Sequence, residues 1–144
     1  RISQAKDSYQ VQSVYQWADY LLLLADLNLA LYEGQPARGL LLAAQQWSAL
    51  EKSQLLRMKT AFGLVSFYRA GCALAAARQG STDVAEGLEI ARTTVRLMNK
   101  TRLPHLPGWA AVLEAGAGIL LRAARRLHDA VEGQEGVNDE LSHL

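Results

Sequence analysis

Apolar residues recur every three or four positions along most of the chain, the spacing that places them on one face of an α-helix. The first such stretch runs from Tyr9 to Tyr32 and is apolar nearly all round, which is typical of a helix covered on more than one side. Gly34 and Pro36 predict that this helix ends and that the next begins after a tight turn. The second helix is expected to run from about 36 to 50.

The second half of the chain repeats this alternation of helix and turn. A third helix is expected from a cap at Ser53 to about Gln79, and a fourth begins after possible cap residues at 81–83. Two prolines within 99–108 predict a loop there, followed by a fifth helix that runs to about Val131.

Five helices joined by short turns, without the alternation of a β-strand, predict an all-α protein. Helix–turn–helix units begin near residues 10, 53 and 105, a loose repeat that favours antiparallel pairs stacked as a tetratricopeptide-like α-solenoid. Gly39 and the small residues at 70–77 predict where the helices cross most closely.

The chain divides into three segments by composition. Residues 1–8 are expected to be a frayed N-terminal segment, residues 9–132 the helical-repeat domain, and residues 133–144 a loose acidic tail. The chain begins with Arg1 rather than with an initiator Met or a signal peptide, so we expect a fragment of a larger protein.

Three segments carry a family resemblance. They are LYEG at 31–34, WSALEKSQLLR at 47–57 and YRAGCALAAA at 68–77. In this order they resemble the C-terminal helical-repeat region of large bacterial serine/threonine protein kinases of the planctomycete and myxobacterial type. Residues 107–110, PGWA, are also similar to the start of that family's next helix.

The resemblance implies a non-catalytic, tetratricopeptide-like region attached to a kinase that precedes it in the parent chain. Such a region would bind a protein partner or associate with itself. The chain departs from the family at 118–126, where no turn interrupts the helical pattern, so the third helix pair is expected to be incomplete or fused.

Charge and hydropathy narrow the range of partners. Fifteen basic against fourteen acidic residues leave a net charge of +1, which gives no electrostatic reason to expect nucleic acid or an anionic membrane. The run from Tyr20 to Tyr32 is shorter than the roughly 20 apolar residues that span a bilayer. The lack of possible disulfides and of a secretion signal favours a cytoplasmic setting.

Residue types that carry chemistry are scattered. Cys72 lies within an apolar helical pattern and is expected to be a buried core residue. The chain shows no glycine-rich phosphate loop, no kinase catalytic motif and no nucleophile elbow, so we expect neither enzymatic activity nor a cofactor. The histidines lack ligand spacing, which argues against a metal site; they stand at 105, 128 and 143. A basic cluster is expected to be a solvated helix face rather than a nucleic-acid contact: Arg122, Arg125, Arg126 and His128.

Asp26 stands in the apolar run LLLLADLNLAL, where an unpaired buried carboxylate would be costly. We therefore predict a buried ion pair between Asp26 and Arg69, with Arg57 as the second choice of partner. The alternative is that Asp26 lines a ligand groove.

Trp17, Tyr20 and Leu24 exceed what a single core stripe needs and form a possible interaction surface. This surface is either the seam to the N-terminal remainder of the parent chain or a groove for a protein partner. A different class of function also stays open, a ligand-sensing helical-repeat domain of a bacterial transcription regulator, which would require an apolar cavity with convergent polar groups.

Overall fold

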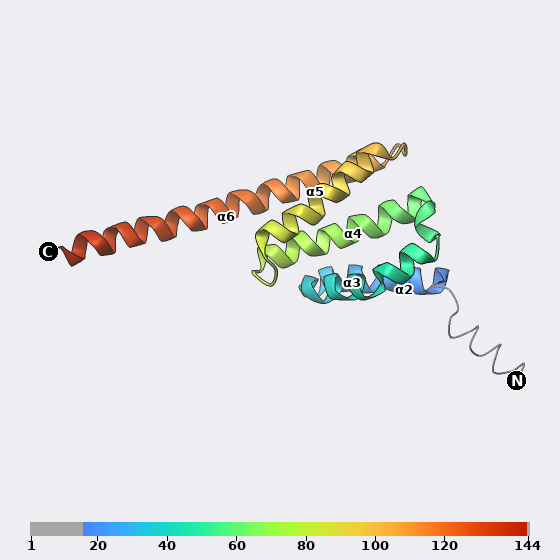
Figure 1. Cartoon of the computed structure of the whole chain (residues 1–144), viewed down its shortest axis with the longest axis horizontal. Helices are drawn as coiled ribbons and strands as arrows, with labels where there is room; N and C mark the ends of the chain where they lie inside the picture. The colour runs from blue at the N-terminus through green and yellow to red at the C-terminus, as the bar shows by residue number, and fades with distance from the viewer. Residues whose placement is uncertain (1–15, 144) are drawn as a thin grey trace, which may run out of the picture.

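A computed structural model describes residues 16–143, and every regular element in this range is a helix (Figure 1). The elements in chain order are α2 (Trp17–Tyr32), α3 (Pro36–Lys52), the short 3₁₀ turn η1 (Leu55–Arg57), α4 (Lys59–Arg78), α5 (Val84–Lys100) and α6 (Leu106–Ser142). The predictions for residues 1–8, and for the helical pattern between Tyr9 and residue 15, lie outside the described residues.

Glycines close two of the turns as the sequence predicts. Gly34 adopts a φ of 69° and Gly80 a φ of 76°, a left-handed conformation that costs a residue without Cβ little. After Gly34, the Gln35 amide donates to the Ala30 carbonyl over 2.8 Å, and Pro36 opens α3 at its first turn. The α2–α3 hairpin therefore has the expected turn.

The start of the third expected helix differs from the prediction. Ser53 accepts a hydrogen bond from the Leu55 amide at 3.2 Å, so its hydroxyl contacts the first residue of the turn η1 and does not cap α4, whose N-cap is Met58. Gln54 has a φ of 67°, and this left-handed residue interrupts the helical path. The long helix α4 begins only at Lys59.

The helices stack in sequence order in two layers (Figure 1). Each helix packs on the next along the chain, and α4 also contacts both α2 and α6, so α2, α4 and α6 share one layer. One hydrophobic core lies among α2, α3 and α4, and the other among α4, α5 and α6. The chain is thus all-α with its helices stacked as in a helical solenoid, and α4 is the helix common to both cores.

Small residues let α3 and α5 approach α4 closely at the predicted stretch. A Cβ added at Gly39 would lie 2.9 Å from the Cys72 Sγ atom. A Cβ added at Gly87 would lie 2.8 Å from the Ala77 Cβ and 3.0 Å from the Ala73 carbonyl oxygen. Both contacts fall within 70–77, so the helices do cross closely there, although the shortest contact of an added Cβ on α4 is at Gly63, 2.5 Å from Leu106 Cδ2.

The helix α4 is long and apolar enough to cross a membrane by length and composition, unlike the shorter run from Tyr20 to Tyr32. Its apolar character has another physical cause, because α4 is packed by helices on both faces and contributes to both cores. Half of the most apolar 18-residue stretch of α4 is buried within the fold.

The last helix is longer than predicted. A fifth helix ending near 131 and a loose tail over 133–144 were expected, but α6 continues to Ser142. The loose tail is therefore wrong for residues 133–142, where two glycines and an acidic composition do not interrupt the helix. The prediction that no turn breaks the chain at 118–126 is confirmed.

Candidate protein-binding surfaces

The central helix α4 presents two hollows on opposite faces. At about 100° per residue, Ser66 and Arg69 point about 180° away from Gly71 and Ala75. Ser66 and Arg69 line a pocket beside α3 and α5, whereas Gly71 and Ala75 line a groove beside α2 and α6. A helix buried on both sides thus supplies the floor of two separate sites.

The first hollow, which we call the α2–α4–α6 groove, has a volume of about 330 Å³. Its lining is mostly apolar, with one charged side chain among the described residues, and comprises Leu31, Phe67, Tyr68, Gly71, Leu74, Ala75, Arg78, Val112, Leu113, Gly116, Ile119 and Leu120. The groove exists because small residues stand where α4 and α6 face it, at Gly71, Ala75 and Gly116.

Large apolar side chains form the exposed rim of the groove. Val112 and Ile119 of α6 are 59% and 48% exposed, and they lie about two helical turns apart on the same side of the helix. The Phe67 ring is held against Trp109 with 5.3 Å between ring centroids, which fixes the wall contributed by α4. Rigid walls and exposed apolar rims are typical of surfaces that bind other proteins.

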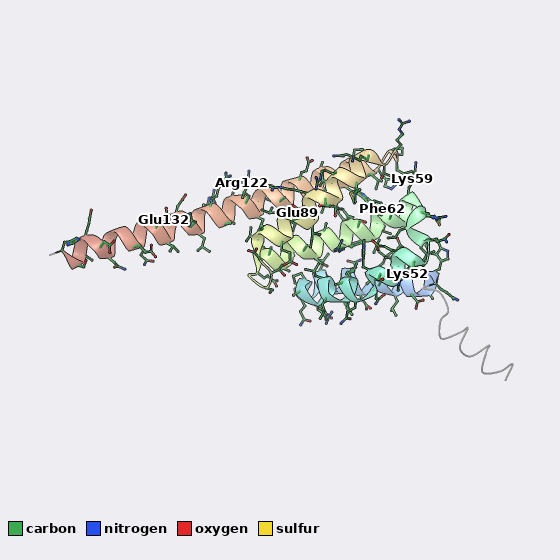
Figure 2. All side chains as sticks on the ribbon, viewed as in Figure 1. Lys52, Lys59, Phe62, Glu89, Arg122 and Glu132 are labelled. Atoms are coloured by element: carbon green, nitrogen blue, oxygen red, sulfur yellow. The ribbon has the colours of Figure 1, made fainter. Side chains whose placement is uncertain are left out.

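The second hollow, which we call the Arg69 pocket, has a volume of about 230 Å³. Its lining combines apolar walls with hydroxyl and charged groups: Trp47, Phe62, Ser66, Arg69, Glu89, Ile90, Thr93, Thr94 and Leu97. Figure 2 labels Phe62 of α4 and Glu89 of α5, which mark the two helices on this face of the molecule.

Arg69 is held in an unusual environment within this pocket. Its guanidinium carbon lies 4.4 Å from the centroid of the Trp47 ring, a cation–π contact, and its Nε atom is buried without a hydrogen-bond partner. Burial lowers the pKa of Arg69, and the charge of Glu51 acts in the opposite direction. The Trp47 indole N–H donates to Glu51 Oε1 over 3.0 Å, which orients the ring beneath the guanidinium.

The predicted ion pair between Asp26 and Arg69 is wrong. The two helices are neighbours, but Arg69 points to the face of α4 that meets α3 and α5, and it stacks on Trp47 instead. Asp26 is half-buried on α2. Neither Asp26 nor Arg57, the second predicted partner, takes part in an ion pair among the described residues. Two residues can lie at the same height along neighbouring helices while their side chains point in different directions around the helix axes.

The predicted interaction surface of Trp17, Tyr20 and Leu24 is not one surface. Tyr20 is only 2% exposed, and its hydroxyl donates to the Ala61 carbonyl over 2.8 Å. Trp17 is exposed and packs edge-on against the Tyr20 ring at 5.4 Å, while Leu24 is half-buried against the core. Tyr20 is therefore a core residue that joins α2 to the start of α4.

The exposed apolar face of α2 lies elsewhere. It follows the helical spacing Leu22, Ala25, Leu29 and Tyr32, all of which are exposed. Two sets of apolar positions in α2 are spaced three and four apart, and the set that the structure buries is the other one: Tyr20, Leu23, Leu27 and Ala30.

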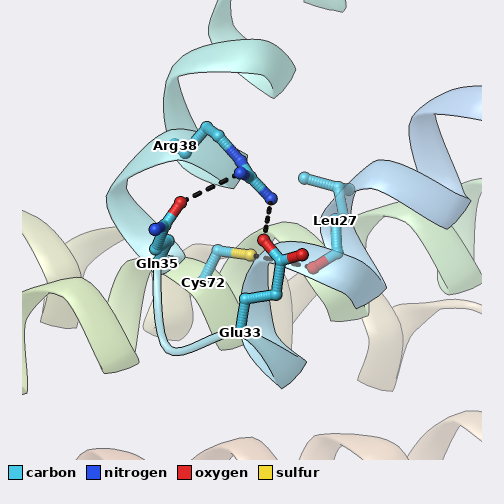
Figure 3. Close-up of polar contacts among 5 residues, drawn as sticks. All are labelled: Leu27, Glu33, Gln35, Arg38 and Cys72. Carbon is cyan, nitrogen blue, oxygen red and sulfur yellow. Dashed lines mark hydrogen bonds and ion pairs between the residues drawn. The ribbon is translucent and has the colours of Figure 1, made fainter.

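Cys72 is buried as predicted, and Figure 3 shows it beside the α2–α3 turn. Its thiol lies 3.8 Å from the Leu27 carbonyl, and burial raises its pKa to about 11. The same view shows Arg38 bound to Gln35 at 2.9 Å and to Glu33 at 2.8 Å across the turn. The thiol is thus a packing element under a turn that an exposed ion pair closes.

Potential metal ligands do not converge within residues 16–143. No group of three or more His, Cys, Asp or Glu side chains in this range is arranged to hold a metal ion. The four residues of the predicted basic cluster are all exposed on α6, and His128 lies 3.2 Å from Glu132 of the same helix. This agrees with a solvated helix face.

No family model, curated protein or solved structure matches the chain.

Proposed function

We propose that the chain is a non-catalytic helical-repeat module that binds a partner protein in the α2–α4–α6 groove. The observation that carries this proposal is the groove itself, an apolar hollow of about 330 Å³ with exposed rim residues and rigid aromatic walls. Stacked helices offer such surfaces because neighbouring helices of one layer leave a continuous furrow between them.

The groove favours one class of partner. Its apolar lining selects apolar side chains, and Arg78 stands near the C-terminal end of α4 as the charge in that lining. We therefore propose that the partner contributes a short segment with apolar anchors and an acidic residue that meets Arg78.

The biological setting of the proposal comes from the sequence resemblance alone. By that resemblance, the chain would be a tetratricopeptide-like scaffold or regulatory region of a cytoplasmic bacterial serine/threonine kinase signalling protein. The exposed stripe of α2, from Leu22 to Tyr32, would then be the surface that meets the N-terminal remainder of the parent chain.

A selection from a phage-displayed library of random peptides tests the groove. Peptides are selected on the wild-type chain, and the dissociation constant of the enriched peptide is then measured by fluorescence anisotropy. We expect Val112→Glu and Ile119→Glu to weaken binding by at least about tenfold, since each buries a charge in an apolar contact. Both side chains are exposed, so neither change threatens the fold.

Leu41→Glu is the matched control, because Leu41 is an apolar residue of α3 that is 59% exposed, as Val112 is, and lies outside the groove. Equal affinity in all four proteins would show that the peptide binds elsewhere, and a selection that enriches no peptide would remove the groove from consideration.

The Arg69 pocket favours a second candidate function, the sensing of a small carboxylate. An orphaned Nε atom, the nearby Ser66 hydroxyl and the apolar walls of Phe62 and Leu97 suit a carboxylate with a short apolar chain. Its volume of about 230 Å³ is below the range of drug-sized ligand sites, so only a small ligand fits.

Isocaproate and its uncharged amide are suitable probes for this second function. We expect isocaproate, but not isocaproamide, to shift the Trp47 indole N–H signal in an NMR titration, and Arg69→Gln to abolish the shift. Arg102→Gln, an exposed arginine outside the pocket, is the control. A shift that the amide also produces, or no shift at all, would contradict carboxylate sensing.

A further inference from the structure

The second half of α6 projects beyond the rest of the molecule. Figure 1 shows α6 extending far past the ends of α4 and α5, and no described residue of α6 after Leu120 is buried. We call residues 123–142 the stem. At a rise of 1.5 Å per residue, the stem is about 30 Å long.

The stem lacks the contacts that normally hold a helix of this length. Most of the stability of a helix in a protein comes from tertiary packing rather than from helix propensity, and each interior glycine costs about 1 kcal/mol relative to alanine. Gly133 and Gly136 both lie within the stem, and nothing lies within 4 Å of a Cβ placed at either position. A partner packed along the stem would supply the missing stabilisation.

An apolar stripe shows which side of the stem such a partner would cover. In the body of the molecule, α6 packs through Ala110, Leu113 and Leu120, which are buried. Further steps of seven residues from these positions continue the stripe outward as Ala124, Leu127, Val131 and Leu141, with polar Gln134 and Asn138 between them. Leu127, Val131 and Leu141 are 69%, 47% and 61% exposed. A stripe repeated every seven residues is the pattern of a helix that pairs with another helix.

The charges of the stem identify the partner. Residues 122–128, at the base of the stem and immediately before it, carry three arginines and no acid, whereas residues 129–140 carry five acids and no Lys or Arg. Figure 2 shows Arg122 near the base and Glu132 further out along the helix. A second copy in parallel orientation would place like charges together, but an antiparallel copy places the basic base of each stem opposite the acidic outer part of the other.

We propose that the stem pairs with the stem of a second copy of this chain as an antiparallel two-helix coiled coil. In one register of the two stems, each stripe residue of one copy faces a stripe residue of the other copy across a two-fold axis. In this register Leu127 packs against the partner's Val131 on both sides of the axis, and Ala124 packs against the partner's Gln134. Val137, which is 55% exposed beside the stripe, meets the partner's Ala123 in the same arrangement.

The proposal concerns a surface separate from the α2–α4–α6 groove and does not depend on the groove having a ligand. The stems offer a small interface, so the dimer dissociates at micromolar concentrations and is weakened by salt. Sedimentation equilibrium of the full chain over a range of concentrations and salt measures both properties.

Two variants on exposed positions test the interface without endangering the fold. Leu127→Glu with Val131→Glu places acids in the central layers and is expected to give a monomer at every concentration. Ile119→Glu, which blocks the groove, lies on another side of α6 and is expected to leave the dimer unchanged. A wild-type chain that is monomeric throughout, or a dimer that persists in the double variant, would overturn the proposal.

Disulfide trapping tests the orientation in a Cys72→Ala background, which removes the native cysteine. Mixing Ala124→Cys chains with Gln134→Cys chains is expected to give a disulfide-linked mixed dimer, while neither variant links to itself. Cross-linking of Ala124→Cys with itself would indicate parallel stems and contradict the antiparallel arrangement.

Discussion

Replacing Gly87 by alanine tests the close packing of α5 on α4. An alanine Cβ at this position would lie 2.8 Å from the Ala77 Cβ and 3.0 Å from the Ala73 carbonyl oxygen. Carbon atoms pack best at about 3.5–4.0 Å, so the first contact is roughly 1 Å too short. Because the second contact is to backbone, a rotamer change cannot relieve it, and α5 must move away from α4.

Two opposing terms set the size of the effect. Alanine is favoured over glycine in a helix interior by about 1 kcal/mol, whereas overpacking a core costs typically about 1–3 kcal/mol. The free energy of unfolding of Gly87→Ala should therefore fall by about 0–2 kcal/mol. Urea denaturation followed by the far-ultraviolet circular dichroism signal at helix wavelengths measures this change.

Gly118→Ala is the matched control, since Gly118 is also within a helix but nothing lies within 4 Å of an added Cβ. This change should raise the free energy of unfolding by up to about 1 kcal/mol through helix propensity alone. The difference between the two variants isolates the overpacking term. Equal stabilisation of both proteins would refute the close approach at Gly87.

Three further predictions concern single side chains. Tyr20→Phe should lower the free energy of unfolding by about 1 kcal/mol by removing the hydrogen bond to Ala61, while Tyr32→Phe at an exposed position changes little. Burial raises the pKa of Tyr20 to about 12, above the ordinary value of about 10. The contribution of Tyr20 to stability is therefore present below pH 10 and is lost as the pH rises towards 12. A wild-type protein whose stability at alkaline pH falls no faster than that of Tyr20→Phe would contradict this. Cys72 should not react with iodoacetamide at neutral pH until the protein is unfolded, because the thiol is buried and its pKa is raised to about 11, and rapid labelling of the native protein would argue against this placement. Asp26→Asn should change the free energy of unfolding by less than about 0.5 kcal/mol, as for other changes away from special features, whereas a loss of about 3–5 kcal/mol would point to a buried ion pair.

The fold was predictable because its signals are local. The spacing of apolar residues, the turn at Gly34 and Pro36, and the small residues at 70–77 each act within one or two helical turns. The end of α6 was not predictable in this way. Gly133, Gly136 and an acidic composition favour a loose chain over a short window, yet the helix continues through them to Ser142.

The candidate site was harder to predict, because side-chain direction depends on the rotation of each helix about its axis. Arg69 was placed at the correct level for Asp26 but on the wrong side of α4, and Tyr20 was placed on the surface when it is in the core. The groove combines residues from three helices, and no short stretch of sequence records how α2 and α6 lie on either side of Gly71.

Isoleucine methyl NMR tests the central claim most directly, because the chain holds three isoleucines and two of them report on different hollows. Ile119 lines the α2–α4–α6 groove and Ile90 lines the Arg69 pocket. On titration with the peptide selected from the library, the Ile119 δ1-methyl signal should shift in a saturable manner while the Ile90 signal stays in place. A shift of Ile90 without a shift of Ile119, or no shift of either signal at saturation, would contradict a protein-binding groove between α2, α4 and α6.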